Sequence, residues 1–168
     1  TGRSQTTFSD RLFDATVAGL NAVESECLRR LVVFEPSDRM TVAVLETLWF
    51  DVAQRIDGQS LIQTFLDRNL LRKVVSTGEF KIGKIHATTL RNRHQNVRAC
   101  HNSLLDNYLA RFSSWQATPF DGYYENRILD HLKIANRHGE AKNVAYFILA
   151  CPNDIGNDAA RKCFEVLG

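Results

Sequence analysis

The sequence of 168 residues lacks several features that would point directly to a function. No apolar run approaches the ~20 residues that a membrane-spanning helix needs, and no secretory signal opens the chain. There is no G-x-x-x-x-G-K-[ST] phosphate-binding loop and no G-x-S-x-G nucleophile elbow. We therefore expect a soluble, cytoplasmic protein with no membrane contact and with no catalytic residues in this segment.

The composition is that of a globular protein. With 44% hydrophobic and 24% charged residues, the chain is long enough for one good core or two small ones. The formal net charge of +2 is too small to indicate nucleic acid or an anionic membrane by itself. Because the chain begins Thr1-Gly2 without methionine, we interpret it as a piece of a longer protein.

Cysteine and histidine show no pattern of a metal site. The cysteines form no C-x-x-C pair and lie far apart, at Cys27, Cys100, Cys151 and Cys163. We expect reduced, mostly buried thiols, because this spacing matches neither a zinc site nor a dense disulfide framework. His94, Cys100 and His101 also fit no standard zinc spacing, and we interpret them as residues of solvent-facing helices.

Apolar residues at three-to-four-residue spacing predict helices at the start of the chain. The stretch "FSDRLFDATVAGL" has such a stripe after a cap at Ser9 or Asp10. In "NAVESECLRRLVVF", Asn21 can cap the helix and Glu24 follows three residues later, which is the pattern of a capping box. Two amphipathic helices are therefore expected before residue 35.

The next stretch predicts two more helices and then a hairpin. Thr41 caps a helix from Val42 to Trp49, and Gly58 breaks the chain before the helical stripe of "QSLIQTFLDRNLL". Two β-branched runs, Leu71–Val75 and Glu79–Ile85, then flank a Ser-Thr-Gly turn, which predicts a β-hairpin. Helices followed by a two-stranded wing are the order of a winged helix-turn-helix.

The second half has no strand signal. Helical spacing recurs in "VRACHNSLLDNYLARFSSW", in "YYENRILDHLKIANRHG" with Gly139 as its C-cap, in "EAKNVAYFILA" and in "DAARKCFEVLG". The predicted fold is therefore mostly α. A winged-helix domain with a short hairpin wing covers residues 1–96, and an α-helical bundle or solenoid-like domain covers residues 97–168.

A winged helix raises the hypothesis of DNA binding. The expected recognition helix is poor in cations, because it offers Gln63, Arg68 and Asn69 beside the acidic Asp67. A basic cluster instead lies on the wing and the helix after it, at Lys81, Lys84, Arg91, Arg93 and Arg98. We interpret them as a solvated or interdomain face with phosphate contacts as the alternative, and nucleic acid is not the expected partner.

Five segments in order resemble a known family. They are "CLRRLVVFEPSDRMTVAVLETLW", "LIQTFLDRNLL", "FKIGKIHATTL", "HNSLLDNYLARFSSW" and "DGYYENRILDHLKIANRHGE". Together they resemble the STAND, or NB-ARC, nucleotide-switch ATPases, close to the apoptotic protease-activating factor branch, over nearly the whole chain. The resemblance implies an upstream nucleotide-binding domain, ADP or ATP as its ligand, a downstream repeat sensor and homo-oligomerisation on activation. This segment would be the arm that keeps the nucleotide-binding domain ADP-bound and autoinhibited.

The resemblance gives His86 a role. The family has a Met/Leu-His-Asp motif where the wing enters the next helix, and its histidine contacts the phosphate end of ADP. Here the triplet is Ile85-His86-Ala87, so the acidic residue that would orient this corner is missing. An imidazole can donate to a phosphate oxygen, and a helix N-terminus favours negative charge. Without the resemblance, His86 would be interpreted as a capping or surface histidine.

Two other functions stay open. One is a DNA-binding winged-helix regulator with a helical dimerisation domain, and the other is a protein-interaction module without a switch.

His131 matches a histidine common in the family's helical domain, and we expect it to pack or hydrogen-bond between helices. The large aromatic residues are expected in cores, at Trp49, Trp115, Tyr123 and Tyr124. No pairing is visible among the carboxylates, such as Asp51, Asp57, Asp67 and Asp106.

Overall fold

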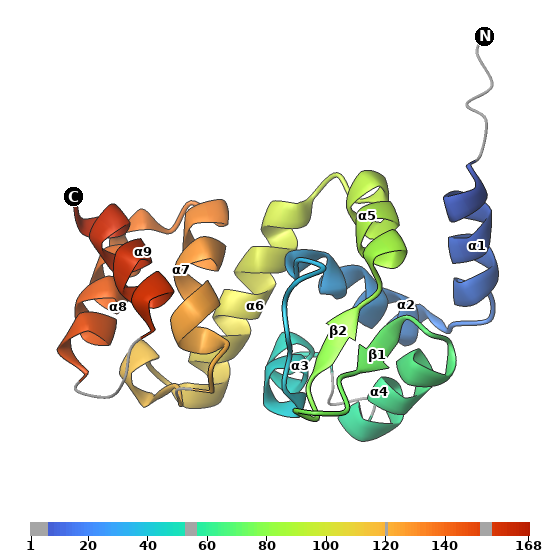
Figure 1. The fold of residues 1–168 in the computed structure, drawn as a ribbon, viewed down its shortest axis with the longest axis horizontal. Helices are drawn as coiled ribbons and strands as arrows, with labels where there is room; N and C mark the ends of the chain where they lie inside the picture. Colours follow the sequence, from blue (N-terminus) through green and yellow to red (C-terminus); the bar gives the residue numbers. More distant parts are fainter. Residues whose placement is uncertain (1–6, 53–56, 120, 152–155) are drawn as a thin grey trace, which may run out of the picture. The chain divides into compact units, whose positions relative to one another are not determined.

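A computed structural model describes residues 7–52, 57–119, 121–151 and 156–168. The chain is mostly helical with a small antiparallel sheet of two strands, as predicted (Figure 1). It divides into two compact units, Thr1–Val97 and Arg98–Gly168, which we call the N-terminal unit and the helical unit. No helix within the described ranges is both long and apolar enough to cross a membrane.

The helices of the N-terminal unit begin close to the predicted positions. They are α1 (Phe8–Val17), α2 (Ala22–Arg30), the 3₁₀ turn η1 (Leu31–Val33), α3 (Val42–Leu48), α4 (Gly58–Asp67) and α5 (Lys84–Arg93). The capping box of α2 is confirmed, because Asn21 Oδ1 accepts from the Glu24 amide and the Glu24 carboxylate accepts from the Asn21 amide. Thr41 caps α3 as expected.

Two helices begin slightly earlier than predicted and use other capping residues. The N-cap of α1 is Thr7, whose hydroxyl accepts from the Asp10 amide at 3.1 Å, so Ser9 and Asp10 lie inside the helix. Gly58 does not break the chain but is the first residue of α4, because Asp57 caps that helix by accepting from the Ser60 amide at 3.0 Å. In both places a side chain just before the predicted start satisfies the free amides.

The hairpin is present but shorter than predicted. Strands β1 (Leu71–Lys73) and β2 (Phe80–Ile82) pair antiparallel, with Leu71 opposite Ile82. Gly78 closes the turn at a φ of 74°, a left-handed conformation that glycine adopts without strain. Met40 adds a bridge that the sequence did not reveal, since Met40 and Phe80 exchange two backbone hydrogen bonds of 2.8 Å.

The core of the N-terminal unit surrounds Trp49, which is buried as expected. Its indole nitrogen donates to the Cys27 carbonyl oxygen at 3.0 Å, and its ring meets Phe65 edge-on at 5.8 Å between centroids. Arg30 is buried beside this core and donates to the carboxylates of Asp51 at 2.5 Å and Glu26 at 3.0 Å. The large buried side chains thereby tie α2, α3 and α4 together.

The helical unit contains α6 (Val97–Phe112), the 3₁₀ turn η3 (Trp115–Ala117), α7 (Tyr124–Ile134), α8 (His138–Ala150) and α9 (Asn157–Leu167). Helices α7, α8 and α9 pack against one another (Figure 1). The predicted C-cap is wrong, because Gly139 lies inside α8. Asn136, with a φ of 63°, adopts the left-handed conformation after α7 instead.

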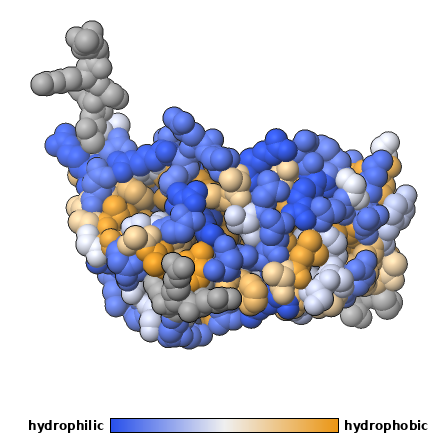
Figure 2. Space-filling view, turned by 180° about the vertical axis from the view of Figure 1, so that it is seen from behind, coloured by the Kyte–Doolittle hydropathy of each residue, from blue (hydrophilic) through white to orange (hydrophobic). Residues whose placement is uncertain are grey.

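The molecular surface is largely hydrophilic on the face shown in Figure 2, with hydrophobic side chains exposed between the polar ones. The most exposed large apolar side chain among the described residues is Val75 in the hairpin turn, at 97%. Phe8 on α1 is 78% exposed, and Tyr146 and Phe164 in the helical unit are each about two-thirds exposed.

Candidate functional site

His86 is the third residue of α5, which follows β2 through Gly83. Gly83 is the N-cap of this helix, and it makes no side-chain hydrogen bond to the first turn. His86 therefore does not cap the helix, and at 8% exposure it is not a surface residue. The interpretation of His86 as a capping or surface histidine is wrong, because its ring is buried inside the N-terminal unit.

The His86 ring lies against Phe13 of α1, with ring centroids 5.9 Å apart. Its Nδ1 atom is buried and has no hydrogen-bond partner in the described part of the chain. Burial, and then the positive charge of Arg72, lower the pKa of His86 below its ordinary value. The imidazole is therefore neutral at pH 7 and carries one N–H donor.

The residues beside His86 leave little free space. A Cβ atom added to Gly83 would lie 3.3 Å from His86 Cδ2, so glycine allows the backbone to approach the imidazole closely. Ala87 is 2% exposed, and an acidic side chain in this position would be removed from water at a high free-energy cost. Packing thus explains the small residues at positions 83 and 87.

Cations lie on the outer face of the hairpin and at the start of α5. Arg72 and Lys81 stand directly opposite each other in the register, and both are exposed. Like charges in this arrangement repel, and no described acidic side chain forms an ion pair with either of them or with Lys84. Arg72, Lys81 and Lys84 therefore carry positive charge without a described ion pair, whereas Glu79 of the same hairpin pairs with Arg39 at 3.7 Å.

Arg91 and Arg93, predicted as interdomain or phosphate contacts, make ion pairs inside the N-terminal unit. Arg91 Nη1 lies 2.6 Å from Glu35 and its Nη2 donates to the Phe34 carbonyl oxygen at 2.9 Å. Arg93 binds Asp14 at 2.5 Å and Asp10 at 3.2 Å. Their guanidinium groups hold α1 and the loop before Pro36 in place.

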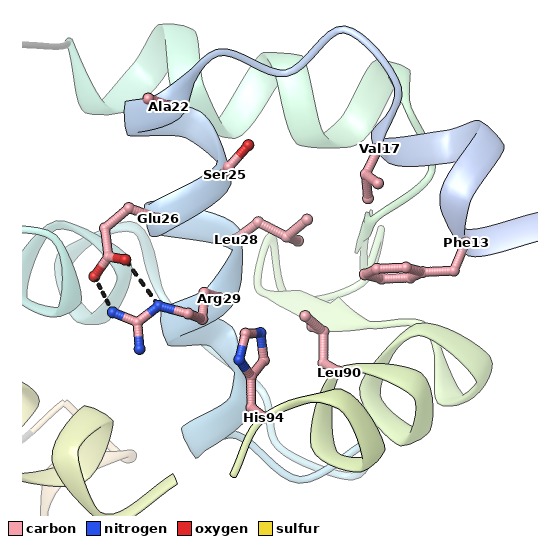
Figure 3. A pocket seen from close by; sticks show the side chains of 9 residues that line it. All are labelled: Phe13, Val17, Ala22, Ser25, Glu26, Leu28, Arg29, Leu90 and His94. Carbon is pink, nitrogen blue, oxygen red and sulfur yellow. Dashed lines mark hydrogen bonds and ion pairs between the residues drawn. The ribbon is translucent and has the colours of Figure 1, made fainter. Parts of the chain in front are cut away.

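Phe13 also lines a pocket of about 390 Å³ (Figure 3). It lies between α1, α2 and α5 and is lined by Phe13, Val17, Ala22, Ser25, Glu26, Leu28, Arg29, Leu90 and His94. The Arg29 guanidinium donates to the Glu26 carboxylate at 2.8 and 2.5 Å, so this pair brings no net charge. Burial, and then Arg29, lower the pKa of His94. An apolar pocket of this kind does not suit a phosphate.

The expected solvent-facing positions of Cys100 and His101 are wrong, since both residues are buried. His101 Nδ1 lies 2.7 Å from Nδ1 of His131, which confirms that His131 hydrogen-bonds between helices. No group of three metal-ligating side chains forms in the described ranges. The cysteines are free, and all are buried except the half-buried Cys151, as predicted.

The carboxylates singled out in the sequence have structural partners. Asp57 caps α4, Asp67 accepts from Gln63, and Asp51 and Asp106 pair with arginines. The aromatic predictions are confirmed, because Trp115, Tyr123 and Tyr124 are buried in the helical unit.

The sequence alone does not reveal two neighbours of His86, Arg72 and Phe13. Arg72 stands opposite Lys81 because Val74 bonds to Glu79 across the turn, whereas the predicted strands paired end to end place Arg72 opposite Ile82. The contact of Phe13 with His86 joins residues 73 positions apart and leaves no local signal.

Compared with known proteins, the sequence matches no family model and no curated protein.

Proposed function

We propose that this chain is the regulatory arm of a STAND-type nucleotide switch, with a winged-helix domain followed by a helical domain. The arm would hold a nucleotide-binding domain in an ADP-bound, autoinhibited state and would gate its oligomerisation. The observation that carries the proposal is the state of His86, whose Nδ1 is buried without a hydrogen-bond partner at the start of α5.

A buried polar atom without a partner costs about 1–3 kcal/mol. Such atoms are rare in folded proteins and need an explanation. A phosphate oxygen would supply the missing acceptor for a protonated Nδ1. The amides in the first turn of α5 have no side-chain cap, and a helix N-terminus favours an anion. Arg72, Lys81 and Lys84 add positive charge nearby. These features together support a phosphate ligand.

The winged-helix assignment is supported by the order of elements. Helices α2, α3 and α4 precede the hairpin of β1 and β2, and Met40 bridges Phe80 between α2 and α3. A winged helix-turn-helix consists of three helices and a wing, with a short strand segment like that at Met40. The helical unit would then lead from the winged helix toward the sensor.

The contact with phosphate would be conditional. His86 is 8% exposed and its ring packs against Phe13, so an incoming phosphate would reach Nδ1 only when the residues that cover it shift. A ligand that binds one arrangement of these residues better than another shifts the population between them. A nucleotide with a different phosphate end, or a changed angle between the domains, would release the arm. The free cysteines fit a cytoplasmic location, where thiols stay reduced.

DNA recognition has less support. Helix α4, which would enter the major groove, contains no lysine or arginine, and its exposed face carries Gln59, Gln63 and Asp67. Arg68 follows α4, but its guanidinium donates to the carbonyl oxygens of Thr16 and Ala18. Base readout needs side-chain donors projecting from this helix, and phosphate contacts need cations around them.

The test is the nucleotide that co-purifies with the longest native protein containing this segment. We expect bound ADP in the wild type and faster ADP exchange in His86→Ala. The matched control is His94→Ala, which removes a half-buried histidine from the other end of α5 and should leave exchange unchanged. If no nucleotide co-purifies, or if both variants exchange ADP at the wild-type rate, the proposal fails.

A further inference from the structure

The helical unit buries two histidines in direct contact. His101 on α6 is 3% exposed and His131 on α7 is 1% exposed. Their Nδ1 atoms lie 2.7 Å apart, and their ring centroids are 4.9 Å apart. The other ring nitrogen of His131, Nε2, lies 2.7 Å from the hydroxyl oxygen of Tyr123. These three side chains form one hydrogen-bonded chain that links α6 to α7.

The central bond of this chain depends on the number of protons. A hydrogen bond between two imidazole nitrogens needs one N–H donor and one bare nitrogen as acceptor. With both histidines neutral, one Nδ1 donates and the other accepts. When both rings are protonated, two N–H groups face each other at 2.7 Å and the bond is lost. The contact between α6 and α7 is thus sensitive to protonation.

The charged groups around His131 oppose an added proton. Arg127 on α7 and Lys162 on α9 act on it with positive charge, as does His101 when protonated. Both cations are held by the same carboxylate, since Asp130 lies 3.2 Å from Arg127 and 2.8 Å from Lys162. Burial, followed by these charges, lowers the pKa of His131 well below its ordinary value.

We propose that the helical unit is a proton-responsive module, in which protonation of the His101–His131 pair separates α6 from α7 and loosens this unit at mildly acidic pH. The neutral pair stabilises the folded state, whereas the unfolded chain binds protons near pH 6.5. The stabilisation is therefore complete above this pH and is lost as the pH falls. The inference does not depend on nucleotide binding.

The first test uses the unmodified chain of 168 residues. The ring protons of its five histidines are followed by NMR from pH 8 to pH 5. The His101 and His131 rings should stay neutral until the amide signals of α6 and α7 change. If His131 titrates near pH 6.5 while the amide spectrum stays constant, the proposal is overturned.

The second test measures unfolding by urea at pH 7.5 and pH 5.5. Trp115 reports on the helical unit in a Trp49→Phe background. We expect its unfolding midpoint to fall by about 1 M for each buried histidine that must become protonated. The double variant His101→Gln, His131→Gln should lose most of this fall, and the control His138→Gln should retain it. An equal fall in the double variant would contradict the proposal. If the double variant does not fold, the NMR titration of the unmodified chain is the deciding test.

Discussion

The two units bury their histidines in opposite ways. In the helical unit, both ring nitrogens of His131 have partners, in His101 and Tyr123. In the N-terminal unit, His86 is similarly enclosed, but its Nδ1 has no hydrogen-bond partner in the described ranges. Burial alone therefore does not identify a functional histidine. A histidine with complete hydrogen bonds is stabilised by its own unit, whereas a buried nitrogen without a partner needs an explanation, such as a water molecule, an ion or a ligand.

The largest effect is expected when the paired histidine becomes apolar. His131→Phe removes two hydrogen bonds of 2.7 Å from a fully buried site, so the unfolding free energy of the helical unit should fall by about 2–4 kcal/mol. Urea denaturation at pH 7.5 measures this change. His138→Phe is the control on the same unit, because His138 is exposed and should change stability little. If His131→Phe lowered the unfolding free energy by less than about 1 kcal/mol, the hydrogen bonds of His131 would not distinguish it from the unpartnered His86.

The N-terminal unit should not tolerate the loss of its buried polar network. Arg30 is buried and binds Glu26, Asp51 and the Leu48 carbonyl oxygen. Arg30→Met should lower the unfolding free energy by about 2–3 kcal/mol, since it breaks a buried network. Arg29→Met is the control, because Arg29 is more exposed, and it should cost less than about 1 kcal/mol. Equal effects in the two variants would show that the unit does not depend on this buried network.

The pH dependence of His86 should have a definite sign. Burial and Arg72 lower its pKa in the folded state, so the unfolded chain binds more protons as the pH falls below about 6.5. The N-terminal unit should lose at most about 1.4 kcal/mol from this histidine at pH 5.5 and nothing at pH 8. Thermal unfolding of the wild type and of His86→Phe, compared at both pH values, isolates this contribution. A His86→Phe chain with the same pH dependence as the wild type would argue against it.

The smallest effect is expected for His86→Phe at neutral pH. Phenylalanine keeps an aromatic ring against Phe13 and removes a buried nitrogen that has no described partner. The unfolding free energy should therefore stay within about 1 kcal/mol of the wild type or rise slightly. This is the same substitution as at His131, so the two variants compare the sites directly. A loss above about 2 kcal/mol would mean that His86 makes a stabilising contact of its own.

Local patterns predicted the elements of this fold well. The capping box at Asn21 and the cap at Thr41 were found because each cap acts within four residues of its own helix. The errors have the same origin. Glycine often ends helices, which favours Gly139 as a helix end, but Asn136 adopts the left-handed conformation here. A single sequence does not tell which residue will do so.

The candidate site was predicted only in part. His86 was singled out from the resemblance, but its burial under Phe13 depends on packing between distant segments. The partnership of His101 with His131 was missed for the same reason, because the two residues are 30 positions apart and lie on different helices. Hydrophobic spacing predicts which face of a helix is buried, and it does not predict which residue that face meets.

The bridge between Met40 and Phe80 also sets an order of assembly. These residues are 40 positions apart, and the chain between them includes α3, α4 and the first strand. Closing a loop of this length costs conformational entropy that local helix formation does not. Helices and the β1–β2 hairpin form from local contacts, so we expect them to precede the closure of this loop. The bridge then joins the hairpin, and with it the start of α5 that carries His86, to the segment before α3.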